Sequence, residues 1–191
     1  MALAKNIDAA ALDRDKLKAA AADFHGQGFN CAQAVACALA PALDLDQDLA
    51  FRMTEGFGAG MGGMTETCGA ISGAVVALGV ANSHGMDDPT SKGSTYKLSK
   101  QLAARFKEKN GTTVCRELKG IGSDEGPRRS CPGCIDDAVD IVVDILSEQV
   151  HASEQELREK QARDALKMSP GEVAFDTAAD VGFSALFDLL P

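Results

Sequence analysis

The sequence predicts an all-α protein, and three observations carry that prediction. No stretch longer than a few residues alternates apolar and polar side chains with the period of two that a half-buried strand requires. Several segments instead repeat apolar residues at helical spacing, between a capping residue and a glycine or proline. Aromatic residues make up only 5% of the 191 residues and alanine is frequent, so small side chains should fill the core of a compact helical bundle.

The first elements follow from local signals. An amphipathic pattern over residues 9–24 predicts the first helix, which ends at the glycines of residues 25–28. Asn30 is expected to cap a second helix, CAQAVACALA, because an Asn side chain accepts hydrogen bonds from first-turn N–H groups. Pro41 ends that helix. The glycine-rich run of residues 56–64, GFGAGMGGM, is then expected to form a loop that leads into the next helix.

The third helix is expected to start at the CGAISG segment, capped by Thr65 or Thr67. Small residues recur in it at every fourth position: Gly69, Gly73, Ala77 and Ala81. Such a ridge carries almost no side chain, so another helix can approach it closely.

The later helices have clear boundaries as well. Asp88-Pro89 restarts a helix that Asn110-Gly111 stops. Thr112 or Thr113 caps a short segment with Cys115, and Ser130 caps the helix CPGCIDDAVDIVVDILSEQ.

The C-terminal part reads differently from the rest. From His151 a polar helix is expected, followed by a break at residues 169–171 and an amphipathic tail over residues 175–189. We therefore expect a four-cysteine helical domain over residues 1–150. Residues 151–191 form a helical extension that packs on the same domain or on a second subunit, the latter giving a homodimer.

Charge and hydropathy exclude several partners. A formal net charge of −9 and a pI near 4.8 give no basic surface for nucleic acid. The longest apolar stretch, residues 68–81, is too short to span a bilayer, and charges at Asp8, Asp13 and Asp15 interrupt any signal peptide. The protein is expected in the cytoplasm, where cysteines serve as ligands or redox thiols more often than in permanent disulfides.

Four of the six cysteines stand within a residue or two of an expected helix start: Cys31, Cys68, Cys115 and Cys131. Unpaired N–H groups and the positive end of the helix dipole favour thiolate over thiol there. Thiolates bind metals or attack disulfides, and the positions alone leave both chemistries open. Arg116, Arg128 and Arg129 lie beside cysteines, as cations that lower the thiol pKa or as a solvated surface.

The two other cysteines are set apart. Cys37 follows Cys31 by six residues, on a different side of the helix, and is expected in the core. Cys134 follows Cys131 by three and shares its face, so dithiol chemistry at this CPGC pair stays open. A thioredoxin fold is not expected, because no strand precedes the motif. No acid–base pair, nucleophile–base set or phosphate loop indicates a hydrolase or transferase.

Taken together, FNCAQAV at Cys31, CGAISG at Cys68, CRELKG at Cys115 and the helix opened by Cys131 resemble the redox-active protein family C_GCAxxG_C_C over about residues 17–146. A similar domain in split-Soret cytochromes c is associated with an iron–sulfur centre. The resemblance implies an all-helical redox protein in which Cys31, Cys68, Cys115 and Cys131 are the candidate ligands and Cys37 and Cys134 are extras. CxxCH haem-attachment motifs are missing, so haem is not carried over.

This resemblance points to electron transfer with a redox partner protein through a cysteine-ligated iron–sulfur cluster, [2Fe–2S] in preference to [4Fe–4S]. The glycines expected to wrap the cofactor and offer backbone N–H groups are Gly58, Gly60, Gly62, Gly63 and Gly69. Two alternatives remain open: a metal-free thiol–disulfide protein, and a structural protein with zinc on four thiolates.

Overall fold

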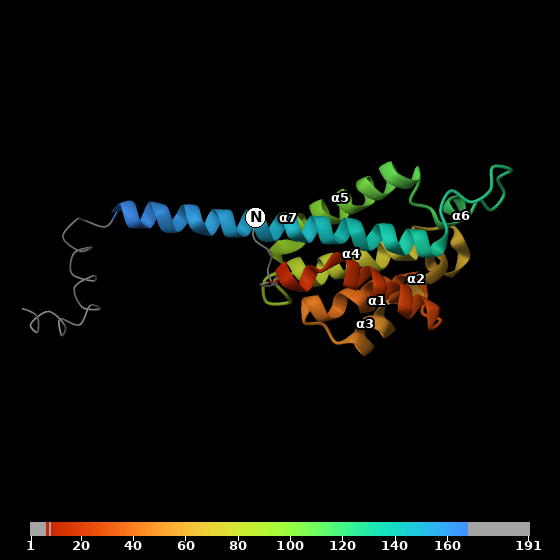
Figure 1. Ribbon diagram of the computed structural model, residues 1–191, viewed down its shortest axis with the longest axis horizontal. Coiled ribbons are helices and arrows are strands. Elements are labelled where there is room, and N and C mark those ends of the chain that lie inside the picture. The colour runs from red at the N-terminus through yellow and green to blue at the C-terminus, as the bar shows by residue number, and fades with distance from the viewer. Residues whose placement is uncertain (1–6, 8, 168–191) are drawn as a thin grey trace, which may run out of the picture. The chain divides into compact units, whose positions relative to one another are not determined.

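The computed structural model describes residue 7 and residues 9–167 of the chain (Figure 1). The described residues form helices and turns, with a single isolated antiparallel bridge between Thr67 and Val114 and no strand, so the all-α prediction is confirmed. The α-helices of this part are α1 (Arg14–Gly26), α2 (Cys31–Leu39), α3 (Gln47–Thr54), α4 (Gly69–Asn82), α5 (Lys92–Asn110), α6 (Cys115–Leu118) and α7 (Cys131–Lys167). Short 3₁₀ segments cover Ala9–Leu12, Ala40–Leu43, Glu55–Phe57 and Pro89–Ser91, and a π-type segment covers Gly60–Met64.

The chain divides into two compact units, Met1–Ala152 and Ser153–Pro191. The first unit holds the hydrophobic core and six whole helices, with the first part of α7. In the second unit the described residues 153–167 continue α7. The side chains of residues 153–165 are mostly exposed and form the i,i+4 ion pairs Glu154–Arg158 and Glu159–Arg163. The expected tail over residues 175–189 lies outside the described residues.

Helix α2 is the centre of the core. All of its nine residues are buried, because α1, α3 and α4 pack around it. Other large buried side chains of the core come from α4, α5 and α7: Ile71, Leu78, Leu102, Phe106, Val139, Val142, Ile145 and Leu146. A helix that is apolar on every side is stable only inside such a shell.

Small residues let α2 and α4 approach closely, as the sequence predicts. A Cβ placed on Gly73 would lie 2.3 Å from the carbonyl oxygen of Ala32, and one on Gly69 would lie 2.5 Å from Cys31 Sγ. Ala77 and Ala81 continue the ridge and are buried. The glycines of α4 therefore bring backbone and sulfur of α2 against the next helix, where any side chain would collide.

Three expected boundaries differ in the structure. The first helix does not run unbroken over residues 9–24: Asp13 interrupts it and caps α1, its carboxylate accepting from the Lys16 N–H at 3.2 Å. Helix α4 starts after Cys68 and not after a capping threonine, because Thr67 is extended in the bridge to Val114. Helix α7 continues through His151, since neither glycine nor proline occurs between Gly133 and Pro170.

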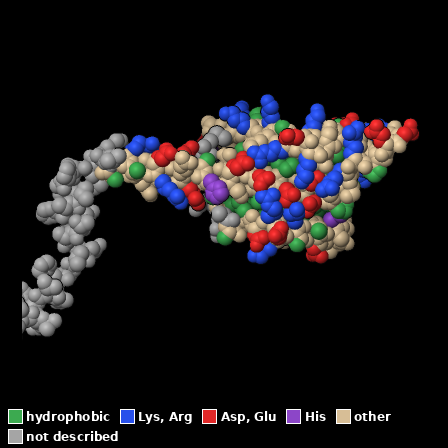
Figure 2. Space-filling model, turned by 45° about the horizontal axis from the view of Figure 1, so that its top comes forward, with side chains coloured by type: hydrophobic (Ala, Val, Ile, Leu, Met, Phe, Trp, Pro, Cys, Tyr) green, Lys and Arg blue, Asp and Glu red, His purple; other side chains and the backbone are tan. Residues whose placement is uncertain are grey.

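An ion-pair network fastens α1 and α5 to the first turns of α7. Asp137 is fully buried and accepts from Arg129 at 2.8 Å and from Lys109 at 2.6 Å. Asp140 pairs with Lys18 at 3.1 Å, and Asp136 pairs with the same lysine. Figure 2 shows cationic and acidic side chains interleaved over the body of the molecule. Since each of these carboxylates has a cationic partner, the network explains the acidic cluster at the start of α7 as packing.

None of the described helices combines the length and the apolar character that crossing a bilayer requires. This agrees with the expectation of no membrane span.

Candidate redox site

Two cysteine-bearing segments, far apart in sequence, are joined backbone to backbone. The N–H of Cys68 donates to the Thr113 carbonyl at 2.8 Å, and the N–H of Cys115 donates to the Glu66 carbonyl at 3.0 Å. This pair of bonds forms the isolated bridge at Thr67 and Val114. It holds the N-terminal ends of α4 and α6 side by side, each with a cysteine at its start.

Cys31 is brought to the same place by the capping of α2. Asn30 accepts from the N–H groups of Ala32 and Gln33, and the Gln33 side chain accepts from the Asn30 N–H, so the expected cap is a full capping box. The Asn30 amide also donates to the Glu55 carbonyl at 2.9 Å. Cys31 is therefore the first helical residue, fixed against the glycine-rich segment and against Gly69.

Five glycines were predicted to surround the cofactor, and only some of them lie against Cys31 and Cys115. A Cβ on Gly60 would be 2.7 Å from the Cβ of Cys115, and one on Gly58 would be 2.6 Å from the Asn30 side chain. Gly69 contacts Cys31 Sγ as described above. Gly62 and Gly63 are exposed, with no atom closer than 3.5 Å to an added Cβ. The structure thus brings Gly60 and Gly69 to the cysteines and leaves Gly62 and Gly63 on the surface.

The backbone of this segment is strained. Ala59, Met61 and Met64 have positive φ angles of 50°, 58° and 61°, in a region that residues other than glycine rarely adopt. Each such residue costs on the order of 1 kcal/mol. The surrounding structure holds the strained turn directly beside Cys31 and Cys115, which is common where a fold positions a functional site.

The N-terminal turn of α7 contributes Cys131 and Cys134. The Ser130 hydroxyl accepts from the Gly133 N–H at 3.2 Å, as expected of a cap. Arg129 packs over this turn, since a Cβ on Gly133 would lie 2.5 Å from its Nε, and its pairing with Asp137 fixes it there. Figure 1 shows the start of α7, α6 and the glycine-rich segment at the same end of the body. Cys134 is buried, whereas Cys131 is half-buried.

The cysteines at this end of the body shift one another's pKa values. Interaction with the Cys68 thiol, followed by burial, raises the pKa of Cys31 well above its ordinary value. Interaction with Cys134 is the main cause that raises the pKa of Cys68 to about 12. Burial raises the pKa of Cys115, and electrostatic interaction with Cys31 and Cys131 raises it further. We call Cys31, Cys68, Cys115, Cys131 and Cys134 the sulfur group; all six cysteines of the chain are free thiols.

For Cys31, Cys68 and Cys115 the pKa lies above its ordinary value, in the direction opposite to the one that a helix N-terminus favours. Backbone N–H groups do act in the expected direction: those of Ala59 and Cys31 lower the pKa of Cys31, and that of Ala70 lowers the pKa of Cys68. Neighbouring sulfurs and burial outweigh them, because several charges cannot gather in one buried volume without a compensating cation.

Lys119 supplies one positive charge at the edge of the group. Interaction with Cys131 raises the pKa of Lys119, and Cys115 and Cys31 act on it in the same direction. The backbone N–H of Lys119 donates to the Cys115 carbonyl at 3.1 Å, so Lys119 lies one helical turn after that cysteine. The ammonium therefore stays charged and lies beside the one sulfur of the group that reaches the surface.

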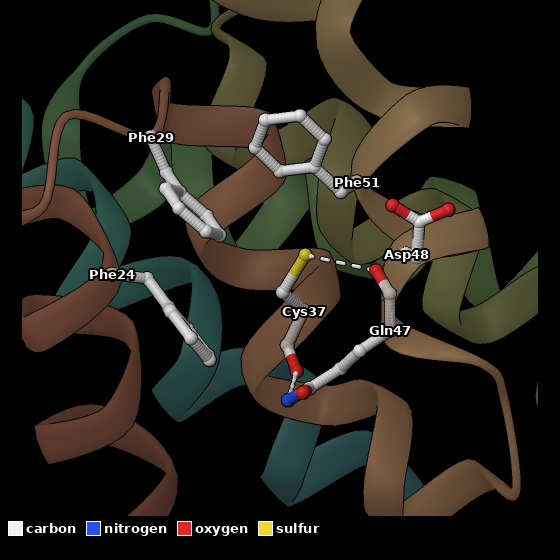
Figure 3. Close-up of a pocket in the computed structure, with 6 residues that line it drawn as sticks. All are labelled: Phe24, Phe29, Cys37, Gln47, Asp48 and Phe51. Carbon is white, nitrogen blue, oxygen red and sulfur yellow. Dashed lines mark hydrogen bonds between the residues drawn. The ribbon is translucent and has the colours of Figure 1, made fainter.

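Cys37 lies outside the sulfur group, as expected of a core cysteine. Its thiol donates to the Gln47 carbonyl at 3.6 Å, and the Gln47 amide donates to the Cys37 carbonyl at 3.0 Å. It lines an open pocket of about 320 Å³ with Phe24, Phe29, Gln47, Asp48 and Phe51 (Figure 3). The Phe29 ring lies at 5.0 Å from Phe24 and at 4.7 Å from Phe51 between centroids.

Two members of the site were not assigned to it from the sequence. Cys134 was expected to be an extra, yet it interacts with Cys68; its i+3 spacing from Cys131 was the available signal. Lys119 was not predicted at all, although it follows Cys115 by four residues and so shares one helical face with it.

The fold and site together define an all-α protein built around a group of cysteines at helix N-termini. The chain belongs to the family described as "putative redox-active protein (C_GCAxxG_C_C)", whose profile matches residues 29–145, more than half of its length. This match confirms the family resemblance and includes every member of the sulfur group. Searches among curated proteins and among solved structures gave no match.

Proposed function

We propose that this redox-active protein transfers electrons through an iron–sulfur cluster held by Cys31, Cys68, Cys115 and Cys131. The observation that carries the proposal is the convergence of thiols from four separate chain segments in one largely buried place. Four cysteine thiolates are the usual ligand set of both [2Fe–2S] and [4Fe–4S] clusters, and the former stays our preference. When bound, such a cluster supplies one-electron exchange.

The donors present fit a cluster in their chemistry. The sulfur group contains only soft ligands, and Lys119 offsets part of the negative charge that four thiolates would carry. Ala59 and Ala70 offer backbone N–H groups to Cys31 and Cys68, the kind of contact that tunes a bound centre. The strained glycine-rich turn holds Ala59 in that position.

The described sulfurs do not form a ready-made tetrahedral site for a single zinc ion. Ligand atoms of a tetrahedral zinc site lie about 4 Å apart, as bonds of about 2.3 Å to sulfur require. Among the described residues, the one group of three or more metal-type ligands whose atoms all lie within 4.8 Å is Asp136, Asp137 and Asp140. No three cysteines of the described residues meet this limit, although Cys68 interacts directly with both Cys31 and Cys134.

Metal-free thiol–disulfide exchange is the second candidate, and the contacts of Cys68 with both Cys31 and Cys134 favour it. Oxidation of two such thiols forms one S–S bond and releases two protons and two electrons to an acceptor disulfide, which becomes two thiols. In this case Cys134 is a reacting residue and not a spare one.

The test is the visible absorption spectrum of the anaerobically purified full chain, with iron, zinc and acid-labile sulfide measured on the same sample. Charge-transfer bands with iron and sulfide would support the cluster, and their ratio would separate the two cluster types. Colourless, iron-free protein from an iron-replete preparation would overturn it, and zinc content would then decide between a structural site and free thiols.

Single substitutions sharpen this test. Cys68→Ser should abolish the bands, whereas Cys37→Ser, outside the sulfur group, should keep them. Cys134→Ser should also keep the bands if a cluster is held by the other four. Loss of thiol–disulfide exchange in Cys134→Ser protein, measured on protein that contains no iron, would favour the dithiol chemistry instead.

We further propose that the function requires a redox partner protein in the cytoplasm. A homodimer formed through the C-terminal tail is tested by sedimentation of a chain that ends at Ser169. An unchanged oligomer size would reject that role of the tail.

A further inference from the structure

The side chain of Asn30 makes contacts in two parts of the molecule at once. Its carbonyl oxygen caps α2, accepting from the Ala32 N–H at 2.9 Å and from the Gln33 N–H at 3.0 Å. Its amide nitrogen donates to the Glu55 carbonyl at 2.9 Å, and Glu55 comes directly before the glycine-rich run. One amide group therefore joins the start of the helix that carries Cys31 to the start of that run.

The cap of α2 does not need this second hydrogen bond. Asn, Asp and Ser cap helices about equally well, because only the side-chain oxygen accepts from the first-turn N–H groups. The caps of α1 and α3 in this chain are Asp13 and Asp46, which have no amide donor. Asn30 differs from them in the NH₂ group that reaches Glu55, so this contact and not the cap explains the amide at this position.

The segment that Asn30 holds packs against the start of α2. A Cβ on Gly69 would lie 2.5 Å from Cys31 Sγ and 2.8 Å from the Phe57 carbonyl oxygen, so the sulfur and this carbonyl border the same gap. Gly58 follows directly, and a Cβ there would lie 2.6 Å from the Asn30 side chain. The segment therefore contacts both the buried cysteine and the residue that caps its helix.

We propose that Asn30 is a positioning residue of the redox site, whose amide holds residues 55–59 against Cys31. Ala59 in this segment has a φ of 50°, a conformation that persists only where surrounding contacts maintain it. The Ala59 N–H interacts with the Cys31 sulfur, and such contacts tune a bound centre. The effect on a centre rests on the proposed function, whereas the hold on Cys31 can be measured without a cluster.

The first experiment measures how readily Cys31 becomes accessible in the reduced, metal-free full chain. Neutral iodoacetamide alkylates a buried thiol only when the structure around it opens, and mass spectrometry reads Cys31 and Cys37 in the same sample. Both cysteines are buried in α2, so unfolding of the helix or of the whole chain exposes both. Release of residues 55–59 exposes Cys31 alone and raises the ratio of the Cys31 rate to the Cys37 rate.

A matched pair of asparagine variants tests the amide. Asn30→Ser keeps an oxygen for the cap and loses the donor to Glu55, so the ratio should rise about three- to tenfold, as the loss of one hydrogen bond gives. Asn82 also donates through its amide, to the hydroxyls of Ser94 and Thr95 at 2.7 Å and 2.9 Å. Asn82→Ser should leave the ratio unchanged, whatever its effect on overall stability. An equal rise in both variants would overturn the proposal.

A matched pair of glycine variants disturbs the same contact and leaves the amide intact. Gly58→Ala places a Cβ against the Asn30 side chain and should raise the ratio as well. At Gly56 an added Cβ meets no atom within 4 Å, so Gly56→Ala should leave the ratio unchanged. Neither glycine has a positive φ, so the backbone accepts alanine at both positions. An unchanged ratio in both Asn30→Ser and Gly58→Ala means that Asn30 does not position Cys31.

The second experiment measures the reduction potential of iron-loaded protein. Asn30→Ser should lower the potential at unchanged iron content, because N–H groups at the sulfurs favour the more negative, reduced state. Asn82→Ser should leave the potential unchanged. A wild-type potential in Asn30→Ser protein would overturn the effect of Asn30 on the centre. Colourless wild-type protein in which the alkylation ratios respond as expected would reject the cluster alone and leave Asn30 as the positioning residue of Cys31.

Discussion

At the scale of single residues, the sulfur group behaves as a set of coupled thiols. Cys31 and Cys68 interact directly, Cys68 also interacts with Cys134, and burial acts on all three. A folded thiol whose pKa lies above the unfolded value keeps its proton where the unfolded chain has lost it. Cys31 and Cys68 therefore stay protonated until a metal displaces the protons, and metal binding should tighten as pH rises.

The pH dependence of stability follows from these shifts. The raised pKa values of Cys31 and Cys68 contribute stability that is fully present below the unfolded cysteine pKa of about 8.5 and is lost as pH rises toward the folded values. We expect urea unfolding of the reduced, metal-free protein to give a free energy that falls between about pH 8.5 and about pH 10.5. Cys68→Ser should flatten this slope, whereas Cys37→Ser should reduce it less; a slope that rises with pH would contradict the assignment.

At the scale of elements, the contact of α2 with α4 sets the distance between Cys31 and Cys68. The capping box fixes where α2 begins, and the bridge at Thr67 fixes where α4 begins. Gly69 and Gly73 then allow the two helices to close up. As the predicted ridge requires, Gly69 leaves space for the Cys31 sulfur and Gly73 leaves space for the Ala32 backbone.

Two glycines of α4 give a matched test of this contact. A Cβ at Gly73 would meet the Ala32 carbonyl at 2.3 Å, so Gly73→Ala should lower the free energy of unfolding by about 1–3 kcal/mol. At Gly79 an added Cβ meets no atom within 4 Å, and Gly79→Ala should raise it by about 0.5–1 kcal/mol through helix propensity. Urea unfolding measures both, and equal effects would show that the close approach is unimportant.

At the scale of the whole molecule, the site belongs to the first unit. Within the part of the chain that the structure describes, the last buried core residue is Leu146, which lies in Met1–Ala152, and every member of the sulfur group precedes it. The described residues of the second unit are mostly exposed. The predicted four-cysteine domain over residues 1–150, with residues 151–191 as a helical extension, is therefore open to a direct test by shortening the chain.

A chain ending at Ala152 should fold by itself. Because the core residues are retained, its free energy of unfolding should match that of the full chain within about 0.5 kcal/mol. Urea titration followed by far-ultraviolet circular dichroism checks this, and the iron content of the shortened chain should equal that of the full chain. A large loss of stability would show that the second unit is needed to complete the first.

The amino-acid sequence alone was enough to predict the helical fold class, most helix starts, the small-residue ridge of α4 and the group of cysteines at helix N-termini. Each depends on local signals such as the Asn30 cap or the spacing of Gly69 and Gly73. Three features required the folded structure: Cys134 joins the site and Cys37 does not, Lys119 lies beside Cys131, and neighbouring sulfurs together with burial raise the pKa of Cys31 and Cys68. Those results depend on which side chains meet across helices and on the loss of water around them, and no local pattern encodes either.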